Sequence, residues 1–145
     1  MMILACVLTG ILWAIARLHV MWGYGSSWPA ASEADLARMV VGANGITKMP
    51  PRASCLAVAV LLTTLGFWPL WRMGVFGSLV PDGVGLSAGV VAAVVFALRG
   101  IAAYLPLWRN RLSEQPFATY DQRYYGPLCF ALASGFAVLL MQGSL

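Results

Sequence analysis

The sequence predicts an all-α integral membrane protein: a bundle of four transmembrane helices with a short amphipathic surface helix in the first loop. Hydrophobic residues make up 61% of the 145 residues, and charged residues only 10%. A soluble domain is roughly one quarter charged, and so short a chain cannot bury this much apolar surface in a core of its own. The apolar residues also form four continuous runs, each close to the roughly 20 residues that cross a bilayer as a helix. Helices are expected because lipid offers no hydrogen-bond partner to the backbone.

The four predicted spans lie in one membrane domain, residues 1–145, and cover about residues 2–22, 53–71, 84–105 and 127–142. The first run has no charged leading segment and no convincing cleavage site, so it reads as a retained helix. In the third, Gly85 and Gly89 have the spacing that lets helices approach closely, although glycine is also simply common in membrane spans. Trp68, Trp71 and Trp108 stand near span ends and are interpreted as anchors at the membrane interface.

The first loop contains the predicted surface helix. Ser32 can cap it, Asp35 stands at the capping-box position and Gly42 can end it. Its apolar side chains share one face: Leu36, Met39 and Val40. We therefore expect a short helix that lies on the membrane.

The start of the fourth span is predicted from "YGPL". Proline is favoured at the first helical position, so Pro127 would begin the helix, with Tyr125 or Gly126 as its cap.

Orientation follows from the basic residues of the loops. The first and third loops carry six, against Arg72 alone in the second loop: Arg38, Lys48, Arg52, Arg109, Arg111 and Arg123. The rule that positive loops stay inside places these two loops in the cytoplasm and both termini outside. The nine basic residues form no stripe on this apolar chain, so no nucleic-acid partner is expected.

Alternating helix directions bring several uncommon residues to the same membrane face. They form the candidate polar cluster or ligand-binding site: His19, Trp22, Arg99, Asp121 and Tyr125. All of them fall at the predicted cytoplasmic ends of the first, third and fourth spans.

Arg99 is the residue of this group that most needs a partner. It lies about six residues inside the predicted third span, or roughly 9 Å at helical rise. A charge at that depth is costly unless it finds a partner or extends its stem toward the interface. Asp121 is the expected partner through an ion pair, with Glu33 and Asp35 as rivals.

The first span presents two alternatives. Arg17 and His19 are about 200° apart around a helix, so they cannot both face the bundle interior, and the sequence favours neither. His19 invites an acid/base or proton-transfer role. A hydrogen bond to a neighbouring loop is the more ordinary explanation, because no second histidine or paired carboxylate accompanies it.

The sequence contains none of the common cofactor or metal motifs. We find no phosphate-binding glycine loop, no nucleophile elbow and no multi-histidine set. The three cysteines, Cys6, Cys55 and Cys129, have neither metal-ligand spacing nor an even count for disulfides. We therefore expect no cofactor and no metal.

Two motifs resemble a known family. "HVMWGYG" gives HxxWxxG, and "FATYDQRYYGPLC" gives FAxxDxxxYxPLC. With Arg99, they are similar to the bacterial family of small four-helix membrane proteins called domain of unknown function 3995. The resemblance covers nearly the whole chain. Members commonly follow the third-span arginine with Gly-Asp, where this chain has Ala102 and Ala103, which gives Asp121 more weight as the partner of Arg99. The resemblance implies fold and a location in the bacterial inner membrane, but no activity.

Two classes of function remain open. The first is a non-enzymatic bundle in the lipid bilayer that binds a lipophilic ligand, a membrane-protein partner or a second copy of itself. The second is a small membrane enzyme acting on a lipid or isoprenoid, with His19 as acid/base and Arg99 on an anionic group. The second class needs a cavity that reaches His19 from the cytoplasmic face.

Overall fold

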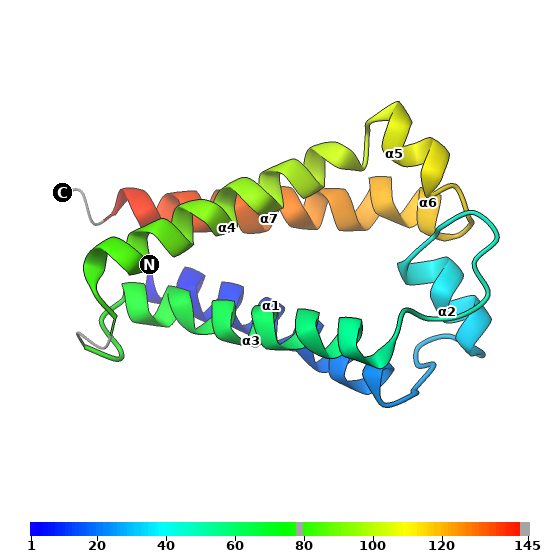
Figure 1. Cartoon of the computed structure of the whole chain (residues 1–145). Helices are drawn as coiled ribbons and strands as arrows, with labels where there is room; N and C mark the ends of the chain where they lie inside the picture. Colours follow the sequence, from blue (N-terminus) through cyan, green and yellow to red (C-terminus); the bar gives the residue numbers. More distant parts are fainter. Residues whose placement is uncertain (78–79, 143–145) are drawn as a thin grey trace.

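The computed structural model describes residues 1–77 and 80–142, and these residues form long and short helices joined by turns (Figure 1). Along the chain they are α1 (Met2–Gly23), α2 (Glu33–Val40), α3 (Arg52–Arg72), α4 (Asp82–Ala102), α5 (Pro106–Arg111), α6 (Phe117–Tyr120), the π-helical turn η1 (Asp121–Tyr125) and α7 (Gly126–Met141). Four stretches are long and apolar enough to cross a bilayer: α1, α3, α4 and the continuous run Phe117–Met141. The predicted fold class is confirmed.

Two helix boundaries differ from the predicted spans. The third span was expected to reach residue 105, but α4 ends at Ala102. Pro106 begins α5 and forces Leu105 into extended backbone (φ −78°, ψ 133°), so the helix must end although the apolar run continues. Arg99 consequently lies in the last turn of α4, nearer the helix end than predicted.

The fourth span also begins earlier than predicted. Helical backbone starts at Phe117 and passes through η1 into α7. Tyr125 and Gly126 both have helical backbone angles, so neither residue is the free cap that "YGPL" predicts. Pro127 instead lies inside a longer helix, and its effect is described with the site.

The four long helices pack as two hairpins, α1 with α3 and α4 with α7 (Figure 1). Within the first hairpin, the Thr9 hydroxyl donates to the Gly66 carbonyl (2.8 Å) and the Trp13 indole donates to the Thr63 carbonyl (3.2 Å). Gly66 leaves room for the indole, since a Cβ there would collide with the Trp13 ring.

The hairpins meet in a shared hydrophobic core formed by all four long helices: Ala5, Leu8, Leu12, Trp68, Ala92, Leu132, Phe136 and Leu139. Trp68 stacks on Phe136 (centroids 4.9 Å apart), and its indole donates to the Gly85 carbonyl at 2.6 Å. Gly89 provides the space for this ring. Trp68 is only 6% exposed, so its interpretation as an interface anchor is wrong. The glycine row of α4 receives tryptophan side chains.

The predicted first-loop helix is present as α2. The Ser32 hydroxyl accepts from the Asp35 backbone N–H at 3.1 Å, and Gly42 follows with a positive φ of 72°, as the capping pattern predicts. Leu36 is fully buried, and α2 packs against α6 at the end of the bundle away from the chain termini (Figure 1). We call this end the loop end.

Candidate functional site

Asp121 lies at the centre of a compact polar group at the loop end. Arg99 Nη2 stands 2.6 Å from Asp121 Oδ1, and the Trp108 indole donates to Oδ2 at 2.9 Å. Both carboxylate oxygens are therefore engaged. The predicted ion pair is confirmed, whereas the rival Glu33 accepts from the Met49 backbone. We call Arg99, Trp108 and Asp121 the Asp121 cluster.

The Asp121 cluster is only partly screened by water. The Asp121 side chain is 4% exposed and that of Arg99 is 29% exposed. The Arg99 guanidinium also lies over the Trp108 ring, 4.9 Å from its centroid, within the range of a cation–π contact. Arg99 Nη1 is buried with no hydrogen-bond partner among the described residues. Charge assistance and low exposure make this the strongest polar contact between α4 and the last helix.

The π-helical turn η1 explains how Asp121 reaches Arg99. Pro127 has no N–H, and in an α-helix its ring would press on the carbonyl four residues earlier. The turn widens instead, and the Gly126 N–H donates to the Asp121 carbonyl, five residues back. The Gln122 carbonyl would then need the missing N–H of Pro127, and the Tyr104 hydroxyl donates to it at 2.8 Å.

Tyr125 joins the last helix to α2. Its hydroxyl donates to the Met39 carbonyl at 3.0 Å, and its ring packs against Phe117. Phe117 in turn lies against Gly42, where any Cβ would collide with its ring. Tyr125 therefore positions the first loop, and no hydrogen bond from its side chain to Arg99 or Asp121 is found in the described chain.

His19 and Trp22 form a separate group on α1. Their rings are 5.0 Å apart, and the Trp22 indole donates to the Trp28 carbonyl at 2.8 Å. His19 Nδ1 lies 2.9 Å from the Ile15 carbonyl; since a carbonyl only accepts, Nδ1 carries the proton. Across residues 1–77 and 80–142, no hydrogen bond or ion pair connects this group to the Asp121 cluster. The five candidate residues thus divide into separate sets.

The structure also separates Arg17 from His19. His19 is half-buried and shares the α1 face of the core residues Leu8 and Leu12, whereas Arg17 is exposed. His19 is thus the one that points inward, and its hydrogen bond goes to its own helix where a neighbouring loop was expected.

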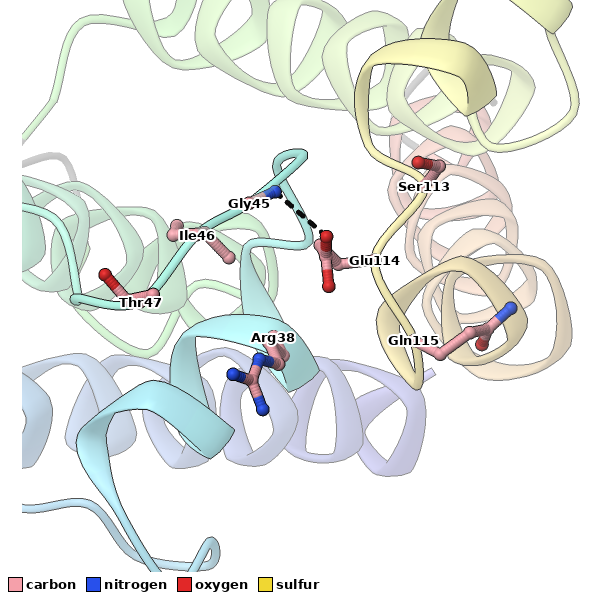
Figure 2. Close-up of a pocket in the computed structure, with 7 residues that line it drawn as sticks. All are labelled: Arg38, Gly45, Ile46, Thr47, Ser113, Glu114 and Gln115. Atoms are coloured by element: carbon pink, nitrogen blue, oxygen red, sulfur yellow. Dashed lines mark hydrogen bonds between the residues drawn. The ribbon is translucent and has the colours of Figure 1, made fainter.

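Two hollows stand out in the described part of the protein. The first, about 510 Å³, lies where the first and third loops meet and is lined by Arg38, Gly45, Ile46, Thr47, Ser113, Glu114 and Gln115 (Figure 2). Glu114 points toward Gly45 and accepts its N–H at 2.9 Å. Arg38 pairs with Asp35 at 3.5 Å. The two charged side chains that line this hollow, Glu114 and Arg38, therefore already have partners within the protein.

The second hollow, about 310 Å³, is an apolar groove between α1 and α3. We call it the α1–α3 groove, and its lining is Val20, Leu56, Ala59, Val60, Thr63 and Thr64. Ala59 forms part of its floor at 3% exposure, while Val60 is 64% exposed at its side. The sequence did not predict this groove. The only signal available was a column of small and β-branched residues on α3, which is typical of any membrane span.

Neither hollow is lined by His19 or Arg99. In the described ranges no three His, Cys, Asp or Glu side chains gather as a metal site would require.

Four apolar helices, joined by polar loops and short helices, define a multi-pass membrane protein. The profile of a family described as "Protein of unknown function (DUF3995)" matches residues 12–136, and the chain belongs to this family. No curated protein and no solved structure matches the chain.

Proposed function

We propose that this protein is a non-enzymatic membrane bundle that binds a lipophilic ligand in the α1–α3 groove. The observation that carries the proposal is the groove itself, an apolar hollow between two membrane-spanning helices. Ligand sites are typically concave and lined by apolar side chains, with a few polar groups. Thr63 and Thr64 supply the polar groups here.

The polar residues support a structural role in preference to the enzyme alternative. A general acid or base needs a free atom within reach of a substrate. Both oxygens of Asp121 are occupied, and His19, although its Nε2 remains free, lines neither of the two hollows where a substrate could bind. An anion-binding role for Arg99 would compete with its 2.6 Å contact to Asp121. A lipid-modifying activity is therefore the less favoured function.

We further propose that the protein lies in a bacterial inner membrane with the loop end in the cytoplasm and both termini outside. The excess of Lys and Arg in the first and third loops supports this orientation. A membrane-protein partner or a second copy remains an alternative occupant of the exposed helix faces, and no role with nucleic acid is proposed.

Photocrosslinking tests the groove. A fatty acid carrying a diazirine in mid-chain, added to the purified protein in detergent, should label α1 and α3 preferentially at Val20, Val60 and Thr63. Val60→Trp fills the groove and should reduce labelling at Val20 and Thr63 at least threefold. Leu61→Trp is the matched control, because Leu61 is 69% exposed on the same helix but outside the groove.

Labelling spread over all apolar helix faces, with α4 as reactive as α3, would contradict the proposal. Equal effects of Val60→Trp and Leu61→Trp on labelling would contradict it as well.

A further inference from the structure

Two basic side chains on the helices of the α1–α3 groove have no acidic partner in the described chain. The ion pairs of the described chain are Arg38–Asp35 and Arg99–Asp121, so neither Arg17 nor Arg52 has a carboxylate within 4.0 Å. Both arginines are exposed. On helices that lipid surrounds, an unpaired guanidinium needs an anion or water at the headgroup layer.

Helix register places Arg52 at the loop-end mouth of the groove. Arg52, Leu56, Ala59 and Thr63 follow i, i+4, i+7, i+11 spacing, so they occupy one stripe of α3. The Arg52 guanidinium rests over the Tyr24 ring, 4.2 Å from its centroid. This cation–π contact holds the guanidinium at the loop-end mouth of the groove. The N–H donors of Arg52 remain free for a ligand.

The same register places Arg17 beside the groove. α1 and α3 are antiparallel, with Gly23 against Leu56 and the Trp13 indole on the Thr63 carbonyl. Arg17 therefore stands level with about residue 60 of α3. It shares a stripe of α1 with Trp13 and Val20. Roughly 12 Å of helical rise separates this level from Arg52, so Arg17 lies beside the acyl-chain part of the groove and not at its mouth.

The length of the groove fits one leaflet of a bilayer. From Arg52 to Thr63 is roughly 16 Å at helical rise, and half of a hydrocarbon core is roughly 15 Å. The Trp13 indole, bonded to the Thr63 carbonyl, marks the inner end. An acyl chain that starts at a headgroup on Arg52 would therefore finish near Trp13.

We propose that the ligand of this groove is an anionic phospholipid, with its phosphate on Arg52 and one acyl chain along Val20, Val60 and Thr63. This inference rests on the proposed function and names its ligand class. The guanidinium fork suits phosphate oxygens, and the exposed Tyr24 hydroxyl can bond the glycerol or headgroup oxygens.

Native mass spectrometry of the full chain tests this inference. The protein in detergent is offered equal amounts of phosphatidylglycerol and phosphatidylcholine with identical acyl chains, one isotopically labelled. We expect at least fivefold more bound phosphatidylglycerol. Arg52→Gln should lower that preference about fivefold, the effect expected for a basic side chain beside an anionic headgroup. Arg52→Lys should retain most of it.

Arg123→Gln is the matched control. Arg123 also lies over a tyrosine ring, 5.8 Å from the Tyr124 centroid, and neither hollow reaches it. The variant should keep the full preference for phosphatidylglycerol. If Arg52→Gln and Arg123→Gln lower the preference for phosphatidylglycerol equally, the preference comes from general surface charge, and the inference is overturned.

Two further outcomes separate this inference from the proposed function. Equal binding of the two phospholipids by the unaltered protein overturns the anionic ligand, while fatty-acid labelling of the groove would leave the proposed function standing. Displacement of bound phosphatidylglycerol by the same concentration of glycerol 3-phosphate would also overturn the inference, because it would show that the acyl chain contributes nothing.

Discussion

At the scale of single residues, Asp121 is the carboxylate that connects α4, α5 and the last helix. It binds Arg99 through one oxygen and Trp108 through the other. Removing one partner of such a pair costs more than the pair itself contributes, because a charge is left without compensation. Arg99 retains access to water at 29% exposure, which limits that cost.

We expect Arg99→Ala and Asp121→Ala to be strongly non-additive in stability. A double-mutant cycle should give a coupling free energy of about 1–3 kcal/mol, since the two groups are in direct contact. Equilibrium unfolding in mixed detergent micelles measures it. The exposed Arg38–Asp35 pair, with side chains 42% and 52% exposed, is the control. Its coupling should stay below about 1 kcal/mol. If the changes in unfolding free energy of the two single variants simply add in the double variant, the ion pair does not contribute to stability.

At the scale of elements, η1 determines which way the side chains that precede α7 in the last helix point. One extra residue in a helical turn rotates the preceding segment by about 100° relative to α7. That rotation directs Asp121 toward α4 and Tyr125 toward the first loop. Pro127 is the local cause, because it cannot donate the hydrogen bond that a regular turn would need.

Pro127→Ala should therefore weaken the Arg99–Asp121 contact. With an N–H at residue 127, the helix can return to α geometry, which turns Asp121 away from Arg99. In this background the double-mutant coupling should fall below about 0.5 kcal/mol, the level of an exposed pair. Pro69→Ala is the control, since Pro69 also lies inside a long helix, α3, but in the other hairpin. An unchanged coupling in Pro127→Ala would show that tertiary packing, and not the proline, maintains η1.

At the scale of the whole molecule, the two hairpins share one core, and the loop end is joined by hydrogen bonds between the first and third loops. The Asn44 side chain donates to the Asn110 carbonyl and accepts from the Ser113 N–H. Glu114 contributes the contact to Gly45 seen in Figure 2. Both loops must therefore lie on the same side of the membrane, which agrees with the proposed orientation.

Cysteine labelling measures that orientation. In a variant with Cys6, Cys55 and Cys129 replaced by alanine, Val75→Cys and Thr47→Cys place single thiols on opposite sides; both positions are exposed. A membrane-impermeant maleimide should label Val75→Cys in intact bacteria, and Thr47→Cys only after permeabilisation. The reverse labelling pattern would show that the loop end lies outside the cell and would contradict the proposed orientation. Labelling of both thiols after permeabilisation controls for their accessibility.

The sequence by itself determined the four spans, the capped α2 helix and the partnership of Arg99 with Asp121. These follow from local periodicity, from cap chemistry and from the high cost of an unpaired charge near lipid. The π-helical turn could not be predicted, because a proline after Tyr-Gly equally indicates a helix start. Whether it begins or distorts a helix depends on the segment before it, and residues 117–125 fold onto α2.

Only the tertiary structure decided which polar residues meet. His19 and Arg99 were expected in one layer, but they belong to different hairpins, and the angle between hairpins is set by Trp68, Phe136 and the glycines of α4. The α1–α3 groove was decided in the same way. Small residues predict close packing, but they do not tell which neighbouring side chain fills the space beside them. The hollow beside Ala59 therefore depends on where the tertiary structure positions Val20 and Leu56. The physical reason is that the apolar composition of a helix determines that it lies in lipid, whereas contacts between two helices depend on the shapes of both helix surfaces.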